Sequence, residues 1–76
     1  MNNVEEAKAV ARASENAVKK PAPDNIREWI NELHGMQKWI DRKGFYSKHM
    51  GPKWASHQEL YFKARISFLL SNIPTH

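Results

Sequence analysis

Histidines are the side chains in this sequence that most readily suggest metal chemistry. There are four, His34, His49, His57 and His76, and no pair of them has the H-x₃-H or HExxH spacing that places two imidazoles on one helix face. The chain has no cysteine, which excludes thiolate zinc sites and disulfides. We therefore expect exposed or capping histidines, with no metal and no cofactor.

Residues for nucleophilic or acid–base catalysis are not found in any familiar arrangement. There is no GxSxG motif and no evident serine–histidine–acid set. Glu28 and Glu32 form an i, i+4 pair that a solvated helix face explains, because a glycosidase-like carboxylate pair needs a pocket. The three glycines are isolated, so no phosphate-binding loop is predicted. The sequence predicts no catalytic residue and a protein that is not an enzyme.

Aromatic and basic residues are interleaved in the segment 44–55, GFYSKHMGPKWA. Rings and cations at this spacing can stack on bases and neutralise phosphates. The nucleic-acid contacts predicted on this basis are Arg27, Lys38, Arg42, Lys48 and Lys53. In the alternative interpretation, the loop aromatics fold back to cap a small core. A helix-turn-helix is not predicted, because this connection exceeds its turn of about 3–4 residues.

The net charge of +4, from 12 basic and 8 acidic residues, is spread thinly along the chain. Dedicated DNA-binding arms usually show denser clusters, so charge alone predicts only weak attraction to polyanions. The longest purely apolar run, Phe68 to Leu70, is far too short to span a membrane, and the N-terminus lacks the apolar run of a signal peptide. We expect a cytoplasmic protein that does not bind membranes.

Two strong helices are predicted, at 25–43 and 57–73. Asp24 is the expected N-cap of the first, whose apolar residues recur every three or four positions and fill one stripe. Ser56 to Glu59 is a capping box at the start of the second, and Pro74 follows its end. With the aromatic loop 44–55 between them, these helices predict an all-α fold, an antiparallel helical hairpin.

The N-terminal segment predicts a weaker helix at 3–20. Its apolar residues are mostly alanines, which contribute little when buried, so a flexible arm and a third helix are both open. Pro21 and Pro23 break the chain after it. We therefore divide the chain into an arm at 1–22 and a hairpin domain at 23–76.

Helix 57–73 carries apolar residues on two faces, whereas one hairpin partner can cover only one. Phe62, Ile66 and Leu69 belong to the first face, and Tyr61 and Phe68 to the second. The pattern therefore predicts self-association, for example as a dimeric four-helix bundle, or a complex with a partner.

The leading functional hypothesis is a small non-catalytic regulatory or inhibitory adaptor that binds a larger protein or complex. Its size and architecture are typical of phage and plasmid accessory proteins. Trp39 lies outside the apolar stripe of its helix, where an exposed ring is typical of an interface anchor. The predicted partner-binding residues are Trp39, Tyr46, Trp54, Tyr61 and Phe68. The alternatives are an RNA- or DNA-binding hairpin that uses the loop 44–55, and a small structural subunit of an assembly.

Overall fold

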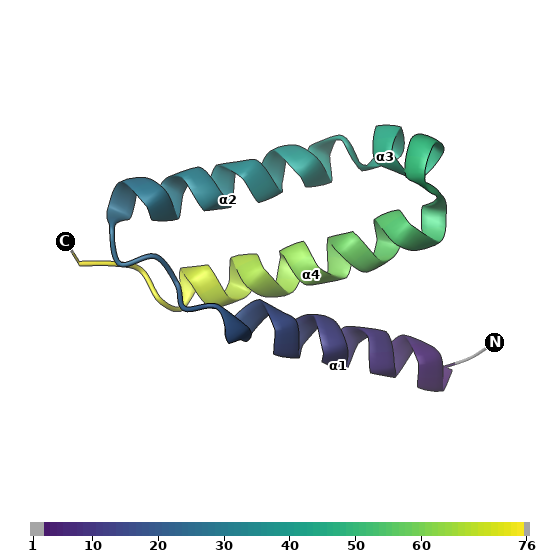
Figure 1. The fold of residues 1–76 in the computed structure, drawn as a ribbon, viewed down its shortest axis with the longest axis horizontal. Coiled ribbons are helices and arrows are strands. Elements are labelled where there is room, and N and C mark those ends of the chain that lie inside the picture. Colours follow the sequence, from purple (N-terminus) through teal and green to yellow (C-terminus); the bar gives the residue numbers. More distant parts are fainter. Residues whose placement is uncertain (1–2, 76) are drawn as a thin grey trace.

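Four α-helices and no strand make up residues 3–75, the part of the chain that the computed structural model describes (Figure 1). The helices are α1 (Asn3–Lys19), α2 (Ile26–Asp41), α3 (Lys43–Met50) and α4 (Pro52–Leu70). The predicted all-helical class is confirmed. The expected loop at 44–55 is wrong, because most of it is helical.

The start of α2 is set by an asparagine side chain. Asn25 accepts hydrogen bonds from the backbone N–H groups of Arg27, at 2.9 Å, and Glu28, at 3.2 Å. The N-cap predicted at Asp24 is therefore wrong by one residue. Asparagine and aspartate cap helices about equally well, so two adjacent candidates cannot be separated by residue type.

A sharp turn at Gly51 separates α3 from α4. Gly51 has a φ of +103°, a conformation that residues with a Cβ rarely adopt. Pro52 follows at the first helical position, where its fixed φ favours helix and its missing N–H costs nothing. The start predicted at Ser56 to Glu59 is wrong, because this proline begins α4 earlier and places the capping-box residues inside the helix.

The three long helices lie side by side in one layer (Figure 1). The central helix, α4, packs against α1 on one side and against α2 and α3 on the other, while α1 and α2 do not pack against each other. In Figure 1, α1 and α4 run in the same direction and α2 runs in the opposite one. The molecule measures 45 × 27 × 14 Å, which is the shape of a slab.

This slab has more surface than a compact chain of its length. Its radius of gyration is 13.6 Å, against about 11.4 Å for a compact domain of this length. Its accessible surface is 5780 Å², against roughly 4800 Å² for a folded monomer of this mass. Domains normally bury their apolar faces between two layers, and the second layer is absent from this single chain.

A small core lies between α2 and α4. Trp29 and Met36 of α2 are buried against Leu69 of α4. The indole Nε1 of Trp29 donates a hydrogen bond of 2.8 Å to the backbone oxygen of Leu69, which joins the start of α2 to the end of α4. The contact between α1 and α4 relies instead on small side chains, since Ala13 and Ala17 are the buried residues of α1.

The second apolar face of α4 is not free. Tyr61 lies beside Ala9 and Ala13 of α1, and Phe68 lies beside Pro21 in the segment between α1 and α2. Both aromatic side chains are half-buried. α1 and the segment after it therefore cover part of the face that the sequence pattern left for a second chain, and self-association itself stays a prediction.

Candidate functional site

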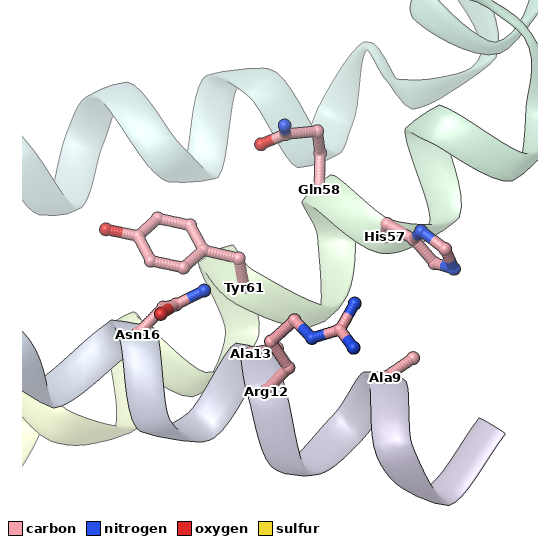
Figure 2. Close-up of a pocket in the computed structure, with 7 residues that line it drawn as sticks. All are labelled: Ala9, Arg12, Ala13, Asn16, His57, Gln58 and Tyr61. Atoms are coloured by element: carbon pink, nitrogen blue, oxygen red, sulfur yellow. The ribbon is translucent and has the colours of Figure 1, made fainter. Parts of the chain in front are cut away.

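A groove between α1 and α4 is lined by five polar residues and two alanines (Figure 2). Its volume is about 360 Å³. Arg12 and Asn16 come from α1, and His57, Gln58 and Tyr61 come from α4. The lining offers hydrogen-bond donors and acceptors and the rings of His57 and Tyr61 but no carboxylate, so it lacks a pair of carboxylates for acid–base catalysis.

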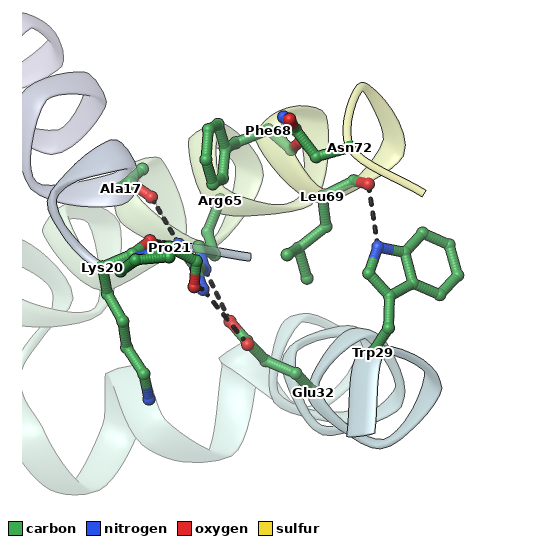
Figure 3. Close-up of polar contacts among 9 residues, drawn as sticks. All are labelled: Ala17, Lys20, Pro21, Trp29, Glu32, Arg65, Phe68, Leu69 and Asn72. Atoms are coloured by element: carbon green, nitrogen blue, oxygen red, sulfur yellow. Dashed lines mark hydrogen bonds and ion pairs between the residues drawn. The ribbon is translucent and has the colours of Figure 1, made fainter. Parts of the chain in front are cut away.

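A buried arginine joins three segments of the chain (Figure 3). The side chain of Arg65 is 1% exposed. Its Nε donates to Glu32 at 2.6 Å, and one Nη donates to the same carboxylate at 3.3 Å. The other acceptors are the backbone oxygens of Ala17, at 2.8 Å, Lys20, and Pro21, at 3.2 Å. The guanidinium therefore links α4 to α2 and to the end of α1.

The hydrogen bonds of this cluster serve to hold the helices together. The last carbonyls of a helix have no partner within the helix, and Arg65 supplies donors to those at the end of α1. The hydrogen bond from Arg65 to Glu32 raises the pKa of the guanidinium and outweighs the opposite effect of burial. Arg65 thus remains charged and fully engaged inside the protein.

Sequence reasoning missed this cluster. The prediction placed Glu32 on a solvated face with Glu28 and gave Arg65 no role. Instead, Glu32 is half-buried and Arg65 is fully buried. The available signal was an isolated arginine amid the apolar positions of a helix, together with a proline break that leaves helix-end carbonyls without partners.

An aromatic cluster lies where α2, α3 and α4 meet. The ring of Trp39 stacks on Tyr46, with centroids 5.0 Å apart and planes 8° apart. It also contacts Trp54, at 6.1 Å, and the edge of Phe62, at 5.1 Å. Trp39 is half-buried. The expectation that Trp39 is an exposed ring on the polar side of its helix is wrong, because α3 folds back and covers it with Tyr46.

Three large apolar side chains remain exposed around this cluster, and we call them the aromatic corner. They are Phe45, at 60% exposed, Met50, at 57%, and Trp54, at 38%. Phe45 also contacts the ring of His49, with centroids 4.4 Å apart. The aromatic corner therefore presents exposed apolar groups beside a cluster of half-buried rings that holds it in shape.

The lysines near the aromatic corner are in different situations. Lys43 forms an ion pair of 2.8 Å with Glu59 and, mainly by this hydrogen bond, lowers the pKa of that carboxyl. The charged Glu59 thus adds stability above the ordinary glutamate pKa, and the contribution is lost as the pH falls through the lowered pKa. Lys48 and Lys53 are exposed, and neither is ion-paired within residues 3–75.

The structure does not bring the five predicted nucleic-acid contacts together. Helical spacing puts Arg27, Lys38 and Arg42 on the outer side of α2, opposite the residues that contact α4. Lys53 lies instead by a groove at the beginning of α1 and α4, with Lys8, Arg12 and His57 among the other lining residues. Positive charge therefore occupies several separate regions of the slab.

The histidines do not converge on one point. His34, His49 and His57 are exposed, and His76 lies outside the described residues. Between residues 3 and 75, no three histidine, aspartate or glutamate side chains lie close enough together to hold a metal ion.

Taken together, these features define a small all-helical protein whose distinctive side chains lie at helix junctions and on open surfaces. No known protein family, no curated protein and no solved structure matches this chain. None of the helices in residues 3–75 is long and apolar enough to cross a membrane.

Proposed function

We propose that this chain is a small non-catalytic regulatory or inhibitory adaptor that binds a larger protein through the aromatic corner. The observation that carries the proposal is the exposure of Phe45, Met50 and Trp54 around a stacked ring cluster. Aromatic residues and methionine are enriched at protein interfaces, and a few such anchors usually supply most of the binding energy.

The rigidity of the corner supports this role. The Trp39–Tyr46 stack joins α2 to α3, and the turn at Gly51 sets the direction of α4. Anchors that are already held in place lose little conformational entropy on binding, which favours affinity. In this proposal Trp54 contacts the partner directly, whereas Trp39 and Tyr46 hold Trp54 in position. Tyr61 and Phe68, which were also predicted as contacts, lie outside the corner.

The proposal includes two further features of the working protein. We place it in the cytoplasm, because a chain without cysteine suits a reducing compartment. We also propose that it self-associates, because its surface exceeds that of a compact monomer.

Nucleic-acid binding is the second candidate, favoured by one observation. The exposed rings of Phe45 and His49 contact each other beside Lys48, and Lys53 follows in the first turn of α4. Such rings can stack on unpaired bases while the lysines contact phosphates. The separation of the remaining basic residues makes this the weaker of the two candidates.

A capture experiment with the full-length chain separates the two candidates. The tagged protein is incubated with lysate of its native host, with and without nuclease, and the captured protein is identified and its affinity measured. Trp54→Ala should weaken binding by about 2 kcal/mol, roughly thirtyfold. Val18→Ala, an exposed site on α1, is the control and should change nothing.

Three results would contradict the adaptor proposal. Binding that nuclease abolishes would favour nucleic acid. Binding of the pure protein to RNA or DNA would also favour nucleic acid. In that case Lys48→Ala and Lys53→Ala should each weaken the binding and lower its salt dependence by about one charge. If Trp54→Ala and the wild-type protein bind the captured partner with equal affinity, the aromatic corner is not part of the interface.

A further inference from the structure

A second apolar surface, separate from the aromatic corner, lies along the boundary between α2 and α4. It consists of Ile26, Ile30 and Leu33 of α2 with Ile66 and Leu70 of α4, and we call it the aliphatic strip. Leu33 and Ile66 pack against the small core and are half-buried. Ile30 is 48% exposed and Leu70 is 52% exposed.

The two helices are held together at the strip by a buried hydrogen bond. The bond from the Trp29 indole to the Leu69 carbonyl fixes the positions of these two residues. Ile30 and Leu70 directly follow them in the sequence, so they belong to the same end of the α2–α4 pair. On each helix, spacing of three or four residues places the strip residues in one line.

The strip lies on the opposite face of the slab from the buried ion pair. Ile30 is about 160° around the α2 axis from Glu32, and Leu70 is about 140° around the α4 axis from Arg65. Glu32 and Arg65 contact each other beneath the segment that joins α1 to α2. That segment covers one face of the layer, and the aliphatic strip therefore lies on the other.

We infer that the aliphatic strip is a dimer interface and that its occupant is the same strip of a second copy of this chain. The inference rests on the self-association proposed above but does not depend on the adaptor's target. Two α2–α4 pairs placed face to face would form a four-helix bundle with a two-fold axis, the commonest symmetry of small oligomers. Each copy would supply the second layer that the other lacks.

The surface area supports a second copy as the occupant. The accessible surface of 5780 Å² exceeds the value for a compact monomer by about 1000 Å², an excess that belongs to the whole slab. A stable interface buries about 800 Å² on each partner, so a dimer contact would be centred on the strip and would include the face around it. A core built on Trp29, Met36 and Leu69 is small for a chain without disulfides, so burial of the strip would add stability that one chain cannot supply.

Charge explains why the strip, and not the aromatic corner, meets a second copy. The strip contains only aliphatic side chains, and Lys63, the nearest lysine on the same side of α4, is ion-paired with Glu59. Two identical strips can therefore pack without bringing unpaired like charges together. At the aromatic corner, a two-fold contact would place the exposed Lys48 of both copies near one another. Like charges across an interface are unfavourable, which leaves the corner to a partner of different chemistry.

Sedimentation equilibrium of the full chain, from sub-micromolar to tens of micromolar, tests the inference. The expected mass is twice 8.9 kDa at the upper concentrations. Ile30→Glu with Leu70→Glu should shift the protein to monomer, whereas Phe45→Glu at the aromatic corner should leave it dimeric. A wild-type monomer over this range, or a dimer that only Phe45→Glu disrupts, would overturn the inference.

A cross-linking experiment keeps the inference testable even where the double variant does not fold. Because the chain has no cysteine, Ile30→Cys introduces a single thiol, and Phe45→Cys is the matched exposed control. Mild oxidation should yield a covalent dimer at Ile30→Cys well above the yield at Phe45→Cys. Equal yields would overturn the inference. Failure of the adaptor proposal would look different from failure of this inference. Trp54→Ala would then bind the target with unchanged affinity while the dimer stayed intact.

Discussion

At the scale of single residues, the side chain that holds the layer together is charged. Arg65 is buried in the C-terminal half of α4, at a position where helices usually carry an apolar residue. Burying a charge is costly unless it is paired and hydrogen-bonded, and Arg65 meets this condition with one carboxylate and three backbone oxygens. The position therefore specifies arginine through its forked geometry as well as its charge.

Replacing Arg65 should be the most damaging exchange of a basic residue in this protein. Arg65→Ala should lower the free energy of unfolding by about 3–5 kcal/mol, since Glu32 and the carbonyls lose their donor. Arg65→Lys should also destabilise the protein, because a single ammonium group cannot replace the several N–H donors of the guanidinium. Urea denaturation followed by far-UV circular dichroism measures the loss. Arg27→Ala, at an exposed site, is the control, and equal midpoints for it and Arg65→Ala would refute this role.

At the scale of the helices, α1 is attached to the protein by its end as much as by its side. Its buried residues Ala13 and Ala17 offer little apolar area, as the sequence indicated. However, the carbonyls of Ala17 and Lys20 are acceptors for Arg65. Loss of this segment should therefore destabilise the rest of the protein.

Deletion of residues 1–22 should markedly lower the thermal stability of the remaining helices. The deletion removes three backbone acceptors of Arg65 and exposes its guanidinium beside an apolar core. Thermal unfolding monitored by circular dichroism gives the change in Tm. Deletion of residues 1–8 is the matched control, because it leaves every contact of Arg65 in place and should have a much smaller effect. Equal Tm values for the two deletions would contradict this view of α1.

At the scale of the whole molecule, the notable property is a flat arrangement without a second layer. The central position of α4 keeps α1 and α2 apart, so the three long helices do not close into a bundle. An exposed aliphatic face is the direct result, and it connects the shape of one chain to its proposed assembly.

Small-angle X-ray scattering should detect this shape in the monomer. At concentrations below the dimer's dissociation constant, or with Ile30→Glu, the radius of gyration should stay near 13.6 Å. A value near 11.4 Å, about that of a compact domain of this length, would mean that α1 folds onto α2 and closes a three-helix bundle. Circular dichroism of the same samples is the control that the helices remain formed.

The sequence alone determined the features that depend on neighbours along the chain. The apolar spacing from Ile26 to Ile40 predicted α2, because a helix places residues three and four apart on one side. The prolines at 21 and 23 predicted the end of α1, because proline removes a backbone donor and restricts the residue before it. The all-helical class followed from the same short-range rules.

Only the tertiary structure decided which side chains are buried. Arg65 acquires its role from acceptors at Ala17 and Glu32. Trp39 is covered because Tyr46 of α3 and Trp54 and Phe62 of α4 lie against it. Helical periodicity gives the direction of a side chain around its own axis but not the helix that lies opposite. Burial depends on that neighbour, and neighbours are set by packing between segments far apart in the sequence.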